Sequence, residues 1–138
     1  MTLTERFSEY VQACFTGLWI ESHEHTDALT EIAQLCRDED WNLATWNIDT
    51  GLSIPGHSEA DLGSSDPLAA IRAINALATP EGTAILVLQS FHRFMQSAEI
   101  VQALAQQIQA GKQNRTILVI LSPIVQIPVE LEKLFVVI

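Results

Sequence analysis

The sequence predicts an α/β fold: three layers, α/β/α, around a mainly parallel, five-stranded sheet. Two runs without a polar residue, 84–88 (AILVL) and 117–121 (ILVIL), are typical of parallel strands that are covered on both faces. Segments with helical periodicity alternate with the strand segments, and right-handed crossovers then make the sheet largely parallel. At 138 residues and 48% apolar content, the chain is expected to form one domain, residues 1–138.

The first third of the chain supplies two helices and two strands. Thr2 and Glu5 have the spacing of a capping box, which predicts a helix over about residues 3–15 that Gly17 ends. Residues 18–20 (LWI) form a short strand. One apolar helical face then continues to Arg37 or Asp40, and a second strand covers residues 42–47.

The remaining elements follow from turn and cap signals. Residues 49–65 contain three glycines, a proline and four serines, and we expect a long surface loop there. Residues 65–67 (SDP) start a helix, and residues 79–82 (TPEG) form a turn after it. Ser97 can cap a further helix that Gly111 should end, residues 129–134 form one or two amphipathic turns, and residues 135–138 (FVVI) form the last strand.

The charge is strongly uneven. Residues 1–66 carry a net charge of −11 and residues 67–138 carry +1. An acidic field repels phosphate backbones, so we expect no nucleic-acid partner and no membrane partner. No secretory signal or membrane span is visible, which predicts a cytoplasmic protein. Cys14 and Cys36 are expected to be small buried hydrophobes.

Ligand sites in such folds lie at the carboxyl ends of the strands. Polar and charged side chains follow each predicted strand there, and we call the candidate contact surface that they form the rim. The rim consists of Glu21, His23, Glu24, His25, Asp49, His92 and Arg93.

The usual chemistry of a nucleotide-binding protein is missing at these positions. Residues 21–26 (ESHEHT) contain no glycine and no lysine, and their two carboxylates lie where the phosphates of a nucleotide would lie. Residues 89–94 (QSFHRF) contain neither of the acids that would hold Mg²⁺. Ser90 and His92 lack an orienting acid, so they make a poor nucleophile and base. We therefore assign no catalytic, cofactor-binding or metal-binding residue.

The order of the motifs resembles the region that precedes the ATPase module in AAA-type ATPases of bacteria, cyanobacteria and plastid genomes. The resemblance covers nearly the whole chain and rests on residues 17–24 (GLWIESHE), 46–52 (WNIDTGL), 66–74 (DPLAAIRAI), 85–94 (ILVLQSFHRF) and 121–133 (LSPIVQIPVELEK). It implies a degenerate RecA/AAA-like domain, with Ser122 in the place of the polar sensor. Relatives often carry an acid near Ser90 and continue past Ile138 into an ATPase, so the chain is either a fragment or a stand-alone remnant.

Two functions remain open. The leading hypothesis is a non-catalytic ATPase-like domain that acts through protein contacts, either in the assembly or regulation of an AAA-type ATPase or by weak self-association, for which residues 135–138 offer a sheet edge. The alternative is an enzyme or nucleotide binder at the same rim. It would retain ATP or ADP binding, or would be a metal-assisted hydrolase that uses His23, His25 and His92.

Overall fold

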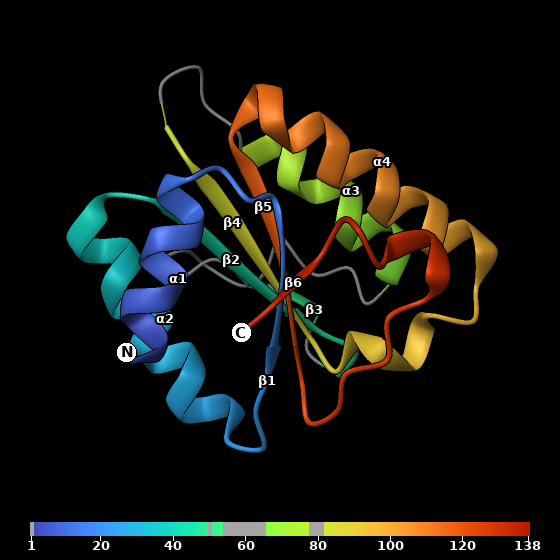
Figure 1. The fold of residues 1–138 in the computed structure, drawn as a ribbon, viewed down its shortest axis with the longest axis horizontal. Helices are drawn as coiled ribbons and strands as arrows, with labels where there is room; N and C mark the ends of the chain where they lie inside the picture. Colours follow the sequence, from blue (N-terminus) through green and yellow to red (C-terminus); the bar gives the residue numbers. More distant parts are fainter. Residues whose placement is uncertain (1, 50, 54–65, 78–81) are drawn as a thin grey trace.

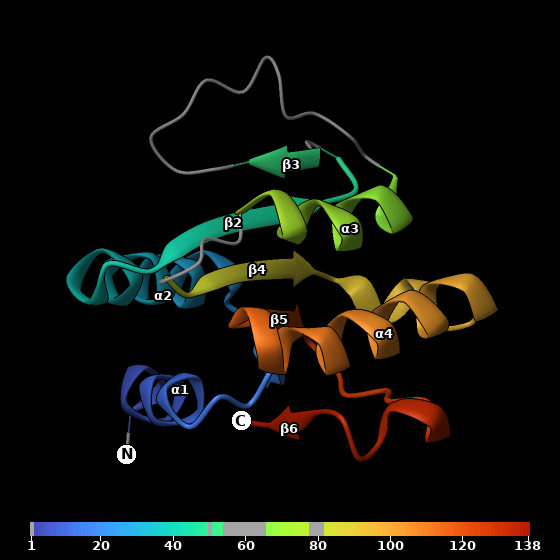
Figure 2. The same ribbon diagram turned by 90° about the horizontal axis from the view of Figure 1, so that it is seen from above.

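The computed structural model describes residues 2–49, 51–53, 66–77 and 82–138, except the side chains of residues 76 and 77. Its centre is a six-stranded sheet with the order β3-β2-β4-β5-β1-β6 (Figures 1 and 2). The strands are β1 (Gly17–Glu21), β2 (Asn42–Asn47), β3 (Gly51–Ser53), β4 (Ala84–Gln89), β5 (Thr116–Ser122) and β6 (Val136–Val137). All neighbouring strands are parallel except β3, which is antiparallel to β2.

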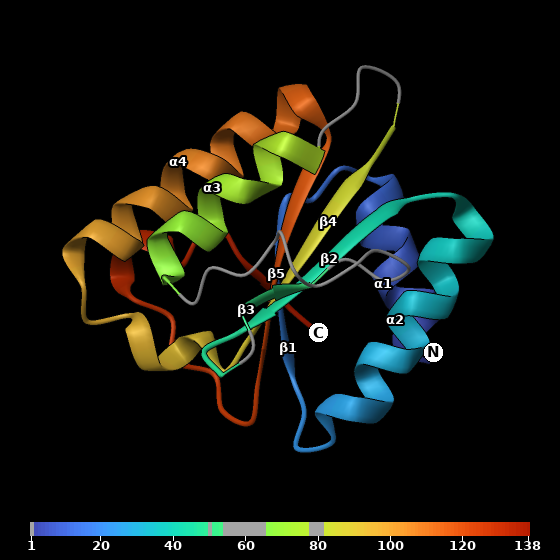
Figure 3. The same ribbon diagram turned by 180° about the vertical axis from the view of Figure 1, so that it is seen from behind.

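Helices cover both faces of the sheet (Figures 1 and 3). Helices α1 (Leu3–Gln12) and α2 (His25–Glu39) lie on one face, and α3 (Pro67–Leu77) and α4 (Ala98–Asn114) lie on the other. Two short 3-10 helices, η2 (Phe91–Phe94) and η3 (Val129–Leu131), interrupt the connections that follow β4 and β5. The predicted three-layer, mostly parallel α/β/α fold is therefore confirmed.

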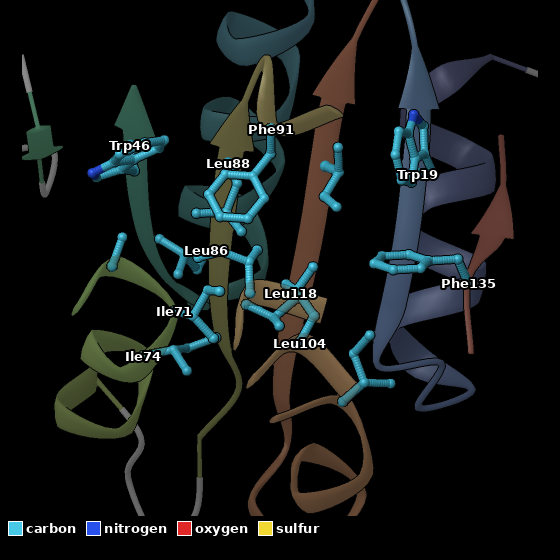
Figure 4. Close-up of a cluster of buried hydrophobic side chains, with 14 of the residues drawn as sticks. Trp19, Trp46, Ile71, Ile74, Leu86, Leu88, Phe91, Leu104, Leu118 and Phe135 are labelled. Carbon is cyan, nitrogen blue, oxygen red and sulfur yellow. The ribbon is translucent and has the colours of Figure 1, made fainter. Parts of the chain in front are cut away.

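Side chains that alternate along the central strands build two separate cores. Trp19, Leu86 and Leu118 are fully buried on the face that α3 and α4 cover, together with the aromatic rings of the cluster in Figure 4. Their chain neighbours belong to the second core, under α1 and α2; examples are Leu18 and Ile85. Because both faces of the sheet are buried, almost every residue of β4 and β5 is apolar.

The sheet has one more strand than predicted, at the edge next to β2. Residues Gly51–Ser53 pair with β2 as strand β3, whereas the sequence suggested a loop from residue 49 onward and five strands in total. Gly51 has a φ of 76°, which only glycine adopts at little cost, and it reverses the chain into the hairpin. Residues 54–65 of the expected loop and residues 79–81 of the expected turn lie outside the described residues.

Two predicted helix ends are also wrong. Helix α1 stops at Gln12, and Gly17 belongs to β1. Helix α4 continues through Gly111 to Asn114, where Arg115 ends it in a left-handed conformation. Helix α3 starts as predicted: the Asp66 carboxylate accepts a hydrogen bond of 3.1 Å from the backbone N–H of Leu68.

Candidate functional site

Strands β1, β2, β4 and β5 all run in the same direction, so their carboxyl ends lie along one side of the molecule. The register aligns Glu21 with Ser122 and Gln89 with Leu121, so these strands end together. The connections that leave them are also joined to one another. The backbone N–H of Ser22 donates to the carbonyl oxygen of Ser122 at 2.9 Å, and the N–H of Ser90 donates to that of Leu121 at 2.8 Å.

The rim has two separate parts. Strand β2 lies three strand positions away from β1, which places its end roughly 14 Å from the end of β1 at about 4.8 Å per strand. Asp49 therefore does not join Glu21 in one cluster. The backbone N–H of Asp49 donates to the side-chain oxygen of Asn47 at 3.0 Å, and Asp49 is exposed.

The connection from β1 to α2 is very short. Only residues 22–24 separate the end of β1 from the first residue of α2. The hydroxyl of Ser22 accepts a bond of 3.1 Å from the backbone N–H of Glu24, and Glu24 is the N-cap residue, with no side-chain cap bond of its own. Glu24 and Asp27 place two carboxylates at the positive end of the helix dipole, where an anionic ligand would otherwise bind.

The connection after β4 is held by the core. Ser90 has a left-handed backbone, with a φ of 56°, and turns the chain into η2. Phe91 is buried and packs edge-on against Trp46, with the ring centroids 5.5 Å apart. This anchor presents Arg93 as an exposed side chain and leaves His92 half-buried.

His92 and His25 are the two rim histidines that the fold brings near each other. Burial is the main reason that the pKa of His92 lies below its usual value, and the nearby charges of Arg93 and His25 lower this pKa further. The Nδ1 atom of His92 is buried and has no hydrogen-bond partner among the described residues. His23 is exposed on the connection before α2.

The positions of the rim histidines do not support the alternative of a metal-assisted hydrolase. In the described ranges, no group of three or more His, Cys, Asp or Glu side chains is placed to hold a metal ion. His23, His25 and His92 are thus not gathered as a metal-binding set. The Nδ1 atom of His92 has no hydrogen-bond partner among the described residues, and so it accepts no bond from the Ser90 hydroxyl.

Ser122, which the family resemblance would place at the polar sensor, has a hydroxyl group that is hydrogen-bonded inside the fold. The indole Nε1 of Trp19 donates to it at 2.8 Å, and the hydroxyl itself donates to the carbonyl oxygen of Ile124. Ser122 is fully buried. The role of Trp19 as its donor was not predicted, since the two residues are 103 positions apart in the chain.

The strand order and the common direction of the central strands define an α/β domain with a largely parallel sheet. The model of the family described as "SpoVK-like AAA ATPase, N-terminal domain" matches residues 3–138. The chain belongs to this family.

Two solved structures from Drosophila show a distant similarity to this chain. A chain of ORC bound to DNA has 14% sequence identity and a TM-score of 0.48, with 97% of this chain and 85% of that chain covered. A chain in the structure of Drosophila ORC bound to AT-rich DNA and Cdc6 has 15% identity and a TM-score of 0.49, with 97% of this chain and 51% of that chain covered. No curated protein matches the sequence.

The predicted partners need a correction. The exclusion of nucleic acid, which rested on the acidic charge of the chain, is wrong: both structures above contain DNA. The likeness concerns the fold, and it does not assign DNA binding to this chain. Within the described ranges, none of the helices is long and apolar enough to cross a membrane.

Proposed function

We propose that this chain is a degenerate, catalytically silent ATPase-like domain that acts through protein contacts in the assembly or regulation of an AAA-type ATPase. In this proposal residues 1–138 form one domain, and the ATPase module is a separate unit. The rim, with its exposed acids and its three histidines, is the contact surface. The family supports the association with an AAA-type ATPase.

The observation that carries the proposal is the three-residue connection between β1 and α2. A phosphate loop needs several backbone N–H groups in a tight curve, usually enforced by glycines, together with a lysine and a hydroxyl. Three residues cannot curve around a phosphate in this way. The Ser22 hydroxyl is already bonded to the N–H of Glu24, and the carboxylates of Glu24 and Asp27 repel an anion at the helix start.

The sensor-like strand supports the same conclusion. A hydroxyl that reads the state of a nucleotide must be free to contact a phosphate or a water molecule. The Ser122 hydroxyl accepts from Trp19 and donates to Ile124, and no solvent-exposed surface remains on this residue. Ser122 therefore acts as a structural link between β1 and the segment after β5.

Calorimetric titration with Mg-ATP and with ADP tests the silent site. We expect no saturable heat, with an intact phosphate-loop ATPase in the same buffer as the positive control. Saturable binding of either nucleotide would contradict the proposal and support the alternative of a residual nucleotide site.

The metal alternative is tested with Zn²⁺, which should raise the melting temperature only if the ions bind the folded state.

The contact role is tested with charge-neutral variants of the rim. The chain is mixed with the ATPase module of a SpoVK-like AAA ATPase, and affinity is measured by calorimetry, with duplex DNA as a parallel arm. We expect Glu21→Gln with Glu24→Gln to weaken module binding about fivefold to tenfold, as for one or two exposed charge contacts. The matched control is Glu31→Gln with Glu39→Gln, two exposed acids further along α2. Equal weakening by both pairs, or binding to DNA but not to the module, would contradict the rim as a protein contact surface.

A further inference from the structure

A recess of about 460 Å³ lies at the opposite end of the strands from the rim, beside the amino end of β1. Its walls come from three places: the connection between α1 and β1, the last turns of α4, and the segment that leads into β6 (Figure 1). It is lined by Ala13, Cys14, Phe15, Thr16, Ile108, Lys112, Lys133, Leu134 and Val136. None of these residues belongs to the rim.

The walls of the recess are held together by a side-chain hydrogen bond, by close backbone packing and by strand pairing. The hydroxyl of Thr16 donates to the carbonyl oxygen of Ile108 at 2.6 Å, which fastens the connection before β1 to α4. Gly17 lies so close to the Leu134 carbonyl that a Cβ would come within 2.5 Å of its oxygen. Val136 pairs with Leu18 as part of β6. The hollow is thus part of the packed fold and is bounded by secondary structure on several sides.

The recess is lined both by apolar side chains and by two lysines. Phe15, Ile108, Leu134 and Val136 contribute apolar side chains, and Phe15 is 43% exposed. Lys112 and Lys133 contribute two ammonium groups, and both residues are exposed. The chain has 17 acids for 7 lysines and arginines. Even so, neither lysine forms an ion pair with any residue that the structure describes.

We propose that this recess binds a small carboxylate with an apolar body, such as a medium-chain alkyl carboxylate. The apolar part packs against the side chains named above, and the carboxylate lies between the two ammonium groups at the mouth. The volume is in the range of small-molecule sites. A phosphate lacks the apolar body that the apolar side chains of the recess would cover, so an alkyl carboxylate fits this lining better.

Cys14 provides a reporter for occupancy. It lines the recess and is partly exposed, whereas Cys36 is buried, and burial raises the pKa of the Cys36 thiol to about 12. Iodoacetamide should therefore modify Cys14 selectively, since the thiolate is the reactive form. A ligand in the recess should slow this reaction. The rate with ligand divided by the rate without it corrects for any change that a variant makes in the thiol itself.

The test compares octanoate with octanol and with inorganic phosphate. We expect octanoate to protect Cys14 in a saturable way and to bind about tenfold more weakly to the Lys112→Gln/Lys133→Gln variant, from the loss of two exposed charge contacts. The control Arg72→Gln removes an exposed cation on α3 and should leave octanoate binding unchanged. Calorimetry with octanoate gives an independent affinity.

Three results would overturn the proposal. The first is equal protection by octanol, which would mean that no carboxylate is recognised. The second is equal protection by phosphate, which would mean that no apolar body is recognised. The third is unchanged octanoate binding in the double variant, given the same urea midpoint as the wild type. Because none of these results depends on the rim, failure here leaves the proposed function of the chain standing.

Discussion

Gly111 lies inside α4, a position where glycine is less favourable than any ordinary residue except proline. The structure explains its presence by close packing. A Cβ at this position would clash with the carbonyl oxygen of Thr116 and approach the Thr16 side chain to 3.2 Å. The glycine therefore lets α4 lie directly against the start of β5, and it does not mark the end of the helix.

Gly111→Ala should destabilise the protein, although alanine is the better helix former. The clash involves backbone that cannot move freely, so we expect a net loss of roughly 2 kcal/mol in the free energy of unfolding. Urea denaturation measures the change. The control Gln113→Ala, at an exposed position of the same helix, should stay within about 0.5 kcal/mol of the wild type. A more stable Gly111→Ala variant would contradict the packing explanation.

His92 should make the protein less stable in acid. Its pKa is lowered in the folded state by burial and by the charges of Arg93 and His25, whereas in the unfolded state it has the ordinary value near 6.5. As the pH falls through that value the unfolded state binds the proton first, so the free energy of unfolding decreases until the pH is below the folded pKa.

The His92→Gln variant isolates this contribution, because every other titrating group is the same in both proteins. We expect its free energy of unfolding to fall less than that of the wild type between about pH 7.5 and about pH 5. Urea denaturation across this range gives the comparison. Parallel pH curves for the two proteins would show that His92 does not bind protons differently on unfolding.

At the scale of the element, α2 shows how a helix end can be under strain. Asp40 ends α2 with a φ of 58°, in the left-handed region that glycine adopts most readily. Its carboxylate also lies at the negative end of the helix dipole. Both features are unfavourable for aspartate, and the described structure contains no side-chain bond of Asp40 that offsets them.

Asp40→Gly should therefore stabilise the protein by about 0.5–1 kcal/mol. Thermal or urea unfolding measures the effect. The matched control is Asp38→Gly, two residues earlier within the helix, where the same substitution should destabilise by about 1 kcal/mol. If both variants lose stability equally, the left-handed cap is not a source of strain.

At the scale of the whole molecule, the acids of α1 and α2 gather on the face of the sheet that these two helices cover. The acids of α1 and α2 are exposed, and none of them forms an ion pair within the described part of the chain. Several lie one helical turn apart, as Glu5 and Glu9 do, or Asp27 and Glu31. Like charges at this spacing destabilise a helix by about 0.2–0.5 kcal/mol per pair.

Salt should consequently stabilise the fold. Raising NaCl from about 10 mM to about 150 mM screens these repulsions, and we expect a gain of roughly 1 kcal/mol in the free energy of unfolding. Urea denaturation at each salt concentration is the measurement. The Glu9→Gln/Asp27→Asn variant should be more stable at low salt and should gain less from added salt. A wild type whose stability does not depend on salt would contradict this explanation.

The candidate site was partly predictable. The positions of Glu21, Ser90 and Ser122 at strand ends follow from apolar runs that stop at a polar residue, because parallel strands place their ends along one edge. The separation of Asp49 from Glu21 and the approach of His25 to His92 were not predictable, since both depend on the order of the strands.

The sequence by itself determined the layers of this protein and the absence of a glycine-rich phosphate loop, because both depend on local patterns: the periodicity of apolar side chains, and the residue types that follow one strand. Only the tertiary structure decided the pairing of β3, the burial of the Ser122 hydroxyl against Trp19 and the recess between Cys14 and Lys133. These features join residues far apart in the chain. Their energies come from packing and hydrogen bonds that exist only after the chain has folded.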